Sequence, residues 1–248
     1  MSILNKTNKI IITIIELIFI AILIYSIIHI FLWYKSNKAN KKVIKEILQA
    51  VEIVNENSEE TPKYKINFEE LKNINSDTIA WIKVESTNIE FPVVKANNNS
   101  YYLTHNFNKA NNKAGWIFAD YKNKFDGTDK NIVIYGHNML DDSMFGTLKN
   151  TLQEEWYNNE NNKYITLVTE NEYTLYEVFS VYQIEKEDYY IKTEFNSDNE
   201  FKEFVQKVSR RSIKDFNIDI SKENSILTLS TCASNNKYRI VLHAVKKG

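Results

Sequence analysis

The chain contains 248 residues, of which 43% are hydrophobic and 25% are charged, and it has a formal net charge of −1 at pH 7. This size suits one packed domain beside a separate segment. Because the chain has only five glycines and two prolines, it is not a collagen-like or low-complexity chain. Because the charge is +4 over residues 1–54 and −5 over the rest, the larger part has no basic excess, and we expect no nucleic acid partner.

The first predicted element is an apolar helix that runs from Ile10 to Tyr34. About 20 apolar residues are enough to cross the hydrocarbon core of a bilayer, so this run of 25 can span a membrane with some tilt. A cleaved signal peptide would have a core of about 7–15 residues followed by small residues, and Ser36 to Ala39 fits that pattern poorly. We therefore expect an uncleaved single-pass anchor over residues 10–34, preceded by a short tail over residues 1–9.

The lysines around this helix leave its orientation open. Two lysines precede it, Lys6 and Lys9. Four more follow it: Lys35, Lys38, Lys41 and Lys42. Because the more basic flank tends to stay in the cytoplasm, the charge pattern alone allows the C-terminal side to be cytoplasmic. Both flanks are basic, as suits contact with anionic lipid heads, so the bias between them is weak.

Two segments connect this helix to the rest of the chain. Between Lys38 and Val54, apolar residues recur at four-residue spacing (Val43, Ile47 and Val51), which predicts an amphipathic helix. Such a helix is a stalk, a helix packed on the domain, or a solvent-side helix with one core stripe. The next residues, Asn55 to Pro62, are polar and acidic and predict a short linker.

The remaining residues predict a mainly β domain. Eight short segments are rich in β-branched and aromatic residues, which suit a half-buried pleated sheet. They are Ile79 to Val84, Ile89 to Val94, Gly115 to Ala119, Asn131 to Tyr135, Tyr164 to Thr169, Tyr173 to Tyr182, Ser225 to Thr231 and Tyr238 to Val245. Two helices are predicted between them, Ser143 to Leu152 and Asp198 to Arg210, the second with Ser197 or Asp198 as its N-cap. Many strands with few helices indicate a closed β-barrel or a sandwich.

A cysteine, a histidine and an arginine stand at the ends of predicted strands. Cys232 is the only cysteine of the chain, so no intrachain disulfide can form. His137 follows another strand end, and Arg239 begins the strand after Cys232, where an antiparallel turn would bring its guanidinium near the sulfur. A thiolate nucleophile, an acid–base imidazole and an oxyanion-binding guanidinium can together perform acyl transfer.

Each of these residues also has an ordinary interpretation. A lone cysteine is commonly a small buried hydrophobe, a turn histidine is commonly solvated, and an arginine at a strand start commonly forms a surface ion pair. His243, on the last predicted strand, is expected to be structural. The four histidines and one cysteine form no zinc signature, and we expect neither a metal nor a cofactor.

Several motifs around the three residues resemble one enzyme family. The run TLSTC that ends at Cys232 is similar to the Thr-Leu-x-Thr-Cys signature of the sortases. The Gly-His pair that ends at His137 and the Ile-Val-Leu run after Arg239 are similar to their histidine and arginine motifs. Gly115 to Asp120 and Met144 to Gly146 resemble segments of class B members. The chain therefore resembles the class B sortases, membrane-anchored cysteine transpeptidases of Gram-positive bacteria.

The resemblance implies an eight-stranded sortase-type β-barrel over residues 63–248, with an N-terminal helix and one inserted helix. It implies that residues 35–62 form an extracellular helix and linker, and that the barrel lies outside the cell while the N-terminal tail is cytoplasmic, against the charge pattern. Carried over to matching positions, Cys232 is the nucleophile and His137 the general acid and base. Arg239 positions the substrate and stabilises the oxyanion.

The implied substrates are a secreted protein with a C-terminal sorting signal, of the Asn-Pro-x-Thr type in class B relatives, and an amine of peptidoglycan. Cys232 would cleave the signal after its threonine, form a thioester and transfer the protein to the amine. Five candidate substrate-binding residues lie near the catalytic ones or before the inserted helix: Ser230, Thr231, Asn138, Tyr189 and Tyr190. Some class B enzymes have an acidic residue two positions after the cysteine, where this chain has Ser234.

Three alternatives use the same features. A hydrolytic cysteine peptidase would release its acyl-enzyme to water, and a pilin-polymerising sortase would use a pilin lysine as the amine. The peptidase would use the same catalytic residues, so product analysis with and without an amine separates it from the transpeptidase. Pilin-polymerising sortases often carry a lid loop over the active site, and the sequence shows no clear one. A non-catalytic, membrane-tethered binding module would have an unreactive, deeply buried Cys232.

Overall fold

The computed structural model describes residues 2–47, 51–54, 63–221, 224–232 and 237–247. The chain divides into two compact units, residues 1–42 and residues 43–248. The first unit belongs to helix α1 (Ser2–Ile47), whose stretch Asn8–Lys35 has a mean hydropathy of 2.8 and exposed side chains. The long apolar helix is therefore confirmed. By length and composition it is either a membrane anchor or a signal sequence.

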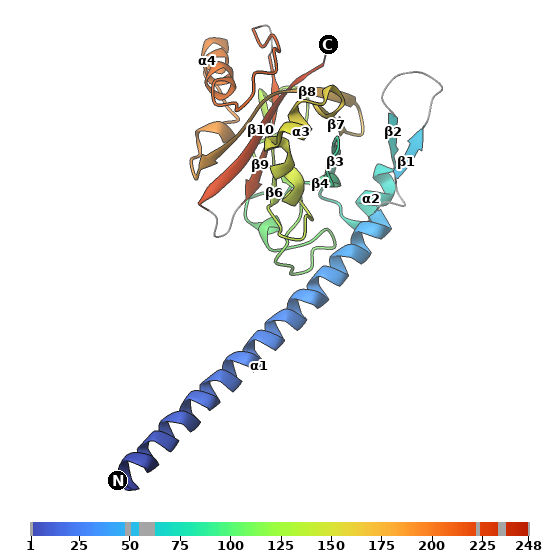
Figure 1. Cartoon of the computed structure of the whole chain (residues 1–248). Helices are drawn as coiled ribbons and strands as arrows, with labels where there is room; N and C mark the ends of the chain where they lie inside the picture. Colours follow the sequence, from blue (N-terminus) through green and yellow to red (C-terminus); the bar gives the residue numbers. More distant parts are fainter. Residues whose placement is uncertain (1, 48–50, 55–62, 222–223, 233–236, 248) are drawn as a thin grey trace. The chain divides into compact units, whose positions relative to one another are not determined.

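The second unit contains a closed eight-stranded barrel, and most of its strands are labelled in Figure 1. Its strands are β3 (Thr78–Val84), β4 (Glu90–Val94), β5 (Phe118–Ala119), β6 (Asn131–His137), β7 (Tyr164–Val168), β8 (Tyr173–Glu185), β9 (Ile226–Cys232) and β10 (Tyr238–Lys246). They follow the order β10-β8-β7-β3-β4-β5-β6-β9, and β9 closes the barrel against β10. The pairs β4–β5 and β6–β9 are parallel and the others antiparallel. All eight predicted strands are present, and closure removes exposed sheet edges.

The barrel core is formed by large apolar side chains from most of its strands. Trp81 and Trp116 are fully buried in it, as are aliphatic residues of the neighbouring strands. Each fully buried large aliphatic side chain stabilises the fold by about 1.5–3 kcal/mol. Val43 and Ile47, at the end of α1, belong to the same core cluster. Of the three interpretations of this helix, the end of α1 therefore fits the one that packs on the domain.

The predicted helix from Lys38 to Val54 is wrong at its C-terminal end. Helix α1 ends at Ile47, and β1 (Val51–Val54) pairs antiparallel with β2 (Lys63–Ile66) in a separate two-stranded sheet. The sequence of β1 is rich in β-branched residues, which favour a strand once a partner strand is available. The predicted linker from Asn55 to Pro62 lies outside the described residues.

Two other predicted elements are shorter than expected. In the predicted strand Gly115 to Ala119, only the last two residues form β5, because Gly115 has φ +58° and turns the backbone. In the predicted helix Ser143 to Leu152, only η3 (Gly146–Leu152) is helical, and it is a 3₁₀ helix. Met144 has φ +53°, a left-handed conformation that cannot continue a right-handed helix.

The inserted helix α4 (Asp198–Ser209) confirms its prediction. The side chain of Ser197 caps it by accepting a hydrogen bond of 3.2 Å from the Glu200 N–H. One face of α4 is buried beside β8 and β10, outside the barrel (Figure 1). The other helical segments are α2 (Phe68–Ile74), α3 (Glu154–Tyr157), η2 (Tyr101–Leu103), η4 (Glu160–Asn162) and η5 (Tyr189–Ile191).

Candidate functional site

The ends of three adjacent strands meet at one rim of the barrel. Strands β6 and β9 run parallel, and their register pairs His137 with Cys232. Strand β10 runs antiparallel to β9, with Val241 opposite Ser230. This pairing ends two residues before Cys232 on β9 and two residues after Arg239 on β10, so Arg239 lies at the same end of the adjacent strand. Because paired residues on neighbouring strands are about 5 Å apart at Cα, His137 and Cys232 are backbone neighbours.

The imidazole of His137 has a defined hydrogen-bond partner. Its Nε2 lies 2.8 Å from the carbonyl oxygen of Leu103, in η2, and the side chain is half-buried. A carbonyl oxygen can only accept, so Nε2 carries a hydrogen and donates it. In the neutral ring Nδ1 is then the unprotonated nitrogen, which is the form a base needs. No sequence pattern predicted this contact, which joins residues 34 positions apart.

Two glycines allow other backbone and side chains to approach His137 closely. A Cβ on Gly115 would lie 2.3 Å from the Tyr102 carbonyl oxygen and 3.0 Å from His137 Cδ2. A Cβ on Gly136 would lie 2.6 Å from the ring of Phe145. Neither position has room for a larger residue unless its surroundings move. Gly115 therefore lets the backbone approach the imidazole, and Gly136 lets Phe145 pack against the residue before His137.

Arg239 lies between two strands at the same rim. On one side β10 pairs with β8, where Arg239 is opposite Ile184, and on the other side it pairs with β9. The side chain is half-buried, and its Nη1 lies 3.4 Å from the carbonyl oxygen of Tyr238. A guanidinium at this rim has donors for an oxygen that becomes negatively charged.

The five candidate substrate-binding residues divide into two groups. Ser230, Thr231 and Tyr190 are at most 2% exposed, and the Thr231 hydroxyl accepts a 2.9 Å hydrogen bond from the Ile240 N–H. The Ser230 hydroxyl and the Tyr190 phenol lie 3.0 Å apart and bond to each other. The other two, Asn138 and Tyr189, are half-buried. A binding role for any of the five stays a prediction, and Ser234 lies outside the described residues.

A buried polar network, which the sequence did not predict, joins side chains of β6, β8, β9 and β10. The Asn131 side chain donates to the Lys192 carbonyl (2.9 Å) and accepts from the Thr228 hydroxyl (2.6 Å). The Thr228 oxygen can then only accept from His243 Nδ1, at 2.8 Å. The Tyr182 hydroxyl donates to His243 Nε2, at 2.9 Å. Every hydrogen in this chain of bonds is assigned, and His243 is neutral with its proton on Nδ1.

His243 should make the stability of the domain dependent on pH. Burial lowers its pKa to about 3, whereas an unfolded histidine has a pKa of about 6.5. Between these values the unfolded chain binds a proton that the folded chain does not, so the free energy of unfolding falls as pH falls. The loss is at most about 1.4 kcal/mol per pH unit. Urea unfolding measures the free energy of unfolding at pH 7 and at pH 5. The decrease between the two pH values should be smaller for His243→Gln than for the wild type. Equal decreases would contradict this assignment.

The three strand ends carry residue types that suit acyl transfer. A cysteine, a histidine and an arginine are the types that act as nucleophile, acid–base group and oxyanion donor in such reactions, and these roles stay predictions for this chain. Within the described ranges, no group of three or more His, Cys, Asp or Glu side chains is placed to hold a metal ion.

Known proteins with this barrel and these motifs match the chain closely. The family model described as Sortase domain matches residues 82–247. Sortase B of Listeria monocytogenes is 37% identical over 171 residues, which are 68% of each chain. Sortase B of Staphylococcus aureus is 30% identical over 240 residues, 94% of this chain and 95% of that protein.

The chain belongs to the sortase B family. It is a sortase B-type cysteine transpeptidase. The solved structure of sortase B from Clostridium perfringens is similar to it, with a TM-score of 0.66 and 41% identity over 73% of this chain and 100% of that one. The resemblance expected from the motifs is therefore confirmed, as is the eight-stranded barrel.

Two further solved sortase B structures contain ligands. One is a complex of the Staphylococcus aureus enzyme with substrate, and the other is a sortase B complexed with triglycine. Each is 32% identical to this chain with a TM-score of 0.69, over 73% of this chain and 84% and 85% of those chains. Those proteins thus bind a substrate and a short peptide that ends in an amine.

Proposed function

We propose that this sortase B cleaves an Asn-Pro-x-Thr type sorting signal after its threonine, through a thioester on Cys232, and transfers the protein to an amine of peptidoglycan. The observation that carries the proposal is the register that pairs His137 with Cys232, and the position of Arg239 at the start of β10, the strand adjacent to β9, supports it. Two relatives with a substrate and with triglycine support a peptide donor and an amine acceptor.

In the proposed first half-reaction, the Cys232 sulfur adds to the threonine carbonyl carbon, and the thiol proton passes to Nδ1 of His137. The carbonyl oxygen becomes an oxyanion, which accepts hydrogen bonds from the Arg239 guanidinium. Collapse of this intermediate breaks the peptide bond, and His137 returns the proton to the leaving amine. The products are a thioester on Cys232 and the free C-terminal fragment of the signal.

In the second half-reaction, the acceptor amine adds to the thioester carbonyl and gives a proton to His137. The oxyanion again lies at Arg239, and its collapse expels the Cys232 thiolate. His137 then returns its proton to that sulfur, so the enzyme is unchanged. The net result is exchange of one amide bond for another, which needs no cofactor.

The anchoring of the enzyme is also proposed. The exposed apolar stretch Asn8–Lys35 has the length of a membrane span, and Trp33 and Tyr34 would lie at its interface. We propose that residues 1–9 are cytoplasmic, that residues 10–34 span the cell membrane, and that residues 35–62 and the domain over residues 63–248 lie outside. Recovery of the N-terminal peptide with the membrane fraction of cells would support an anchor, and its loss would identify a signal sequence.

Product analysis tests the reaction. We expect the full chain in detergent to cleave a quenched fluorescent peptide with an Asn-Pro-x-Thr signal, and to join its N-terminal part to added triglycine or a diaminopimelate-type amine. Mass spectrometry of the products, with a Leu-Pro-x-Thr peptide as control, checks this result. Cleavage without ligation at any amine would indicate a hydrolytic peptidase, and no cleavage of either peptide would favour a binding module.

A further inference from the structure

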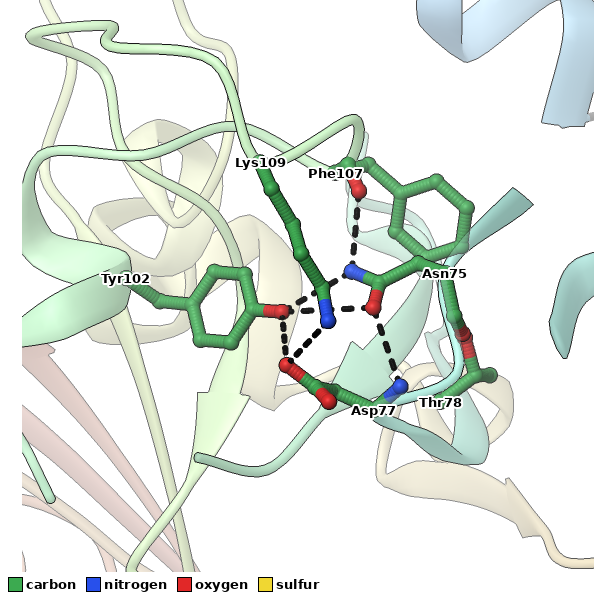
Figure 2. Close-up of polar contacts among 6 residues, drawn as sticks. All are labelled: Asn75, Asp77, Thr78, Tyr102, Phe107 and Lys109. Atoms are coloured by element: carbon green, nitrogen blue, oxygen red, sulfur yellow. Dashed lines mark hydrogen bonds and ion pairs between the residues drawn. The ribbon is translucent and has the colours of Figure 1, made fainter. Parts of the chain in front are cut away.

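A cluster of polar side chains, buried at Asn75 and Tyr102 and partly exposed at Asp77 and Lys109, lies next to the segment that contacts His137. We call Asn75, Asp77, Tyr102 and Lys109 the Asn75 cluster (Figure 2). The Tyr102 hydroxyl donates to Asp77 Oδ2 at 2.6 Å and accepts from Asn75 Nδ2 at 2.9 Å. Lys109 Nζ lies 3.0 Å from the same Asp77 oxygen. The cluster thus joins the turn between α2 and β3 to the loop that contains η2.

The cluster requires a tyrosine hydroxyl in the protein interior. Tyr102 is 1% exposed and Asn75 also 1%, so an unbonded hydroxyl there would be costly. Burial and the bond to Asp77 raise the pKa of Tyr102, which therefore stays protonated and donates. Asn75 is fixed as well, because its Nδ2 donates to the Phe107 carbonyl at 2.8 Å. A phenylalanine would fill the same core space, so the hydroxyl serves to hold the backbone in one place.

The backbone next to Tyr102 is in direct contact with His137. Leu103, the following residue of η2, provides the carbonyl oxygen that accepts from His137 Nε2. The Tyr102 carbonyl accepts a 2.9 Å hydrogen bond from the Trp116 N–H, and Gly115 permits this close approach. The phenol and the two carbonyls belong to consecutive residues of a short, tight helix, so a shift of the phenol moves the Leu103 carbonyl.

We infer that Tyr102 is a positioning residue of the reaction, an inference that rests on the role proposed above for His137. Its hydroxyl, held by Asn75 and Asp77, fixes the Leu103 carbonyl at His137 Nε2 and so keeps Nδ1 as the base. Asn75 and Asp77 precede the matched sortase range of residues 82–247. The segment between α2 and β3 is therefore part of the support of the catalytic histidine.

The test compares two tyrosines in the full chain in detergent. Tyr102→Phe should lower kcat about 10-fold with KM unchanged, because a shift well below 1 Å at a reacting group has an effect of this order. Tyr182→Phe is the matched control: its hydroxyl is equally buried and bonds to His243, away from His137. Both variants should lose thermal stability to a similar degree, but Tyr182→Phe should keep the wild-type kcat.

A second measurement does not depend on activity. In the wild type, ¹⁵N chemical shifts of the neutral His137 ring should show hydrogen on Nε2 alone, and in Tyr102→Phe both neutral forms should be populated. An unchanged His137 spectrum and an unchanged kcat in Tyr102→Phe would overturn the inference, even if the wild type is an active transpeptidase. Conversely, an inactive wild type would remove the proposed function, while the spectra would still decide whether Tyr102 orients His137.

Two variants of Asp77 cover the case in which Tyr102→Phe does not fold. Asp77→Asn keeps an oxygen for the Tyr102 hydroxyl, so kcat should stay within about threefold of the wild type, below the 10-fold change expected for a displaced base. Asp77→Ala removes this acceptor and should reproduce the kcat and His137 spectrum expected for Tyr102→Phe. Equal kcat in the two Asp77 variants would overturn the inference.

Discussion

Cys232→Ala should lower turnover of the sorting-signal peptide by at least about 10⁴-fold, because loss of a covalent nucleophile is among the largest effects a single substitution has. No other cysteine in the chain can replace it. The strand that holds it should keep its place, since β9 is paired by backbone bonds with β6 and β10. Steady-state rates, with intact-mass spectra that show a peptide adduct in the wild type and none in the variant, check this prediction.

The matched control for Cys232→Ala is Ser225→Ala, immediately before the first residue of the same strand. It also removes one polar atom, but residue 225 lies beside the opposite mouth of the barrel, near Lys246. We expect its turnover to equal that of the wild type. Turnover of the folded Cys232→Ala variant above about 1% of the wild type would exclude a thioester on this residue, because no water-mediated route would retain so much of the rate.

The eight barrel strands could be predicted because each is a local pattern. Segments such as Asn131 to Tyr135 and Ser225 to Thr231 are apolar, β-branched and bounded by polar residues, which is enough to recognise a strand. The antiparallel pairing of the strands at Cys232 and Arg239 could also be predicted, since few residues separate them in the sequence. The sequence therefore predicted β10, the neighbour of β9 that lies close to it in the chain.

Other features depend on contacts between distant residues, which local patterns do not contain. Local patterns do not predict the parallel pairing that sets His137 beside Cys232. The expectation that they act together rested on their residue types at strand ends and on the family motifs. The sequence predicts a strand at Gly115. In the structure this residue has a positive φ, and its lack of a Cβ leaves room for the Tyr102 carbonyl. The hydrogen bond from His137 to Leu103 could not be inferred either, because every residue has a backbone carbonyl, whatever its side chain.

His137→Gln should lower turnover by about 10²–10⁴-fold, the usual contribution of a general acid–base group. A glutamine amide can still donate to the Leu103 carbonyl, as Nε2 of His137 does at 2.8 Å, so the surrounding backbone should stay in place. It cannot exchange a proton, so it cannot replace the imidazole as a general acid or base. Steady-state turnover of the sorting-signal peptide by both enzymes checks this.

The matched control is His105→Gln, because His105 is also half-buried and its Nδ1 lies 2.8 Å from a backbone carbonyl oxygen, that of Tyr101. Glutamine can keep that bond as well, and His105 is not among the rim residues, so its turnover should match the wild type. If His137→Gln retains turnover within threefold of the wild type, the imidazole transfers no proton in the rate-limiting step. The pairing of His137 with Cys232 would then have a structural role in the barrel only, and the amine of the substrate would be the candidate base.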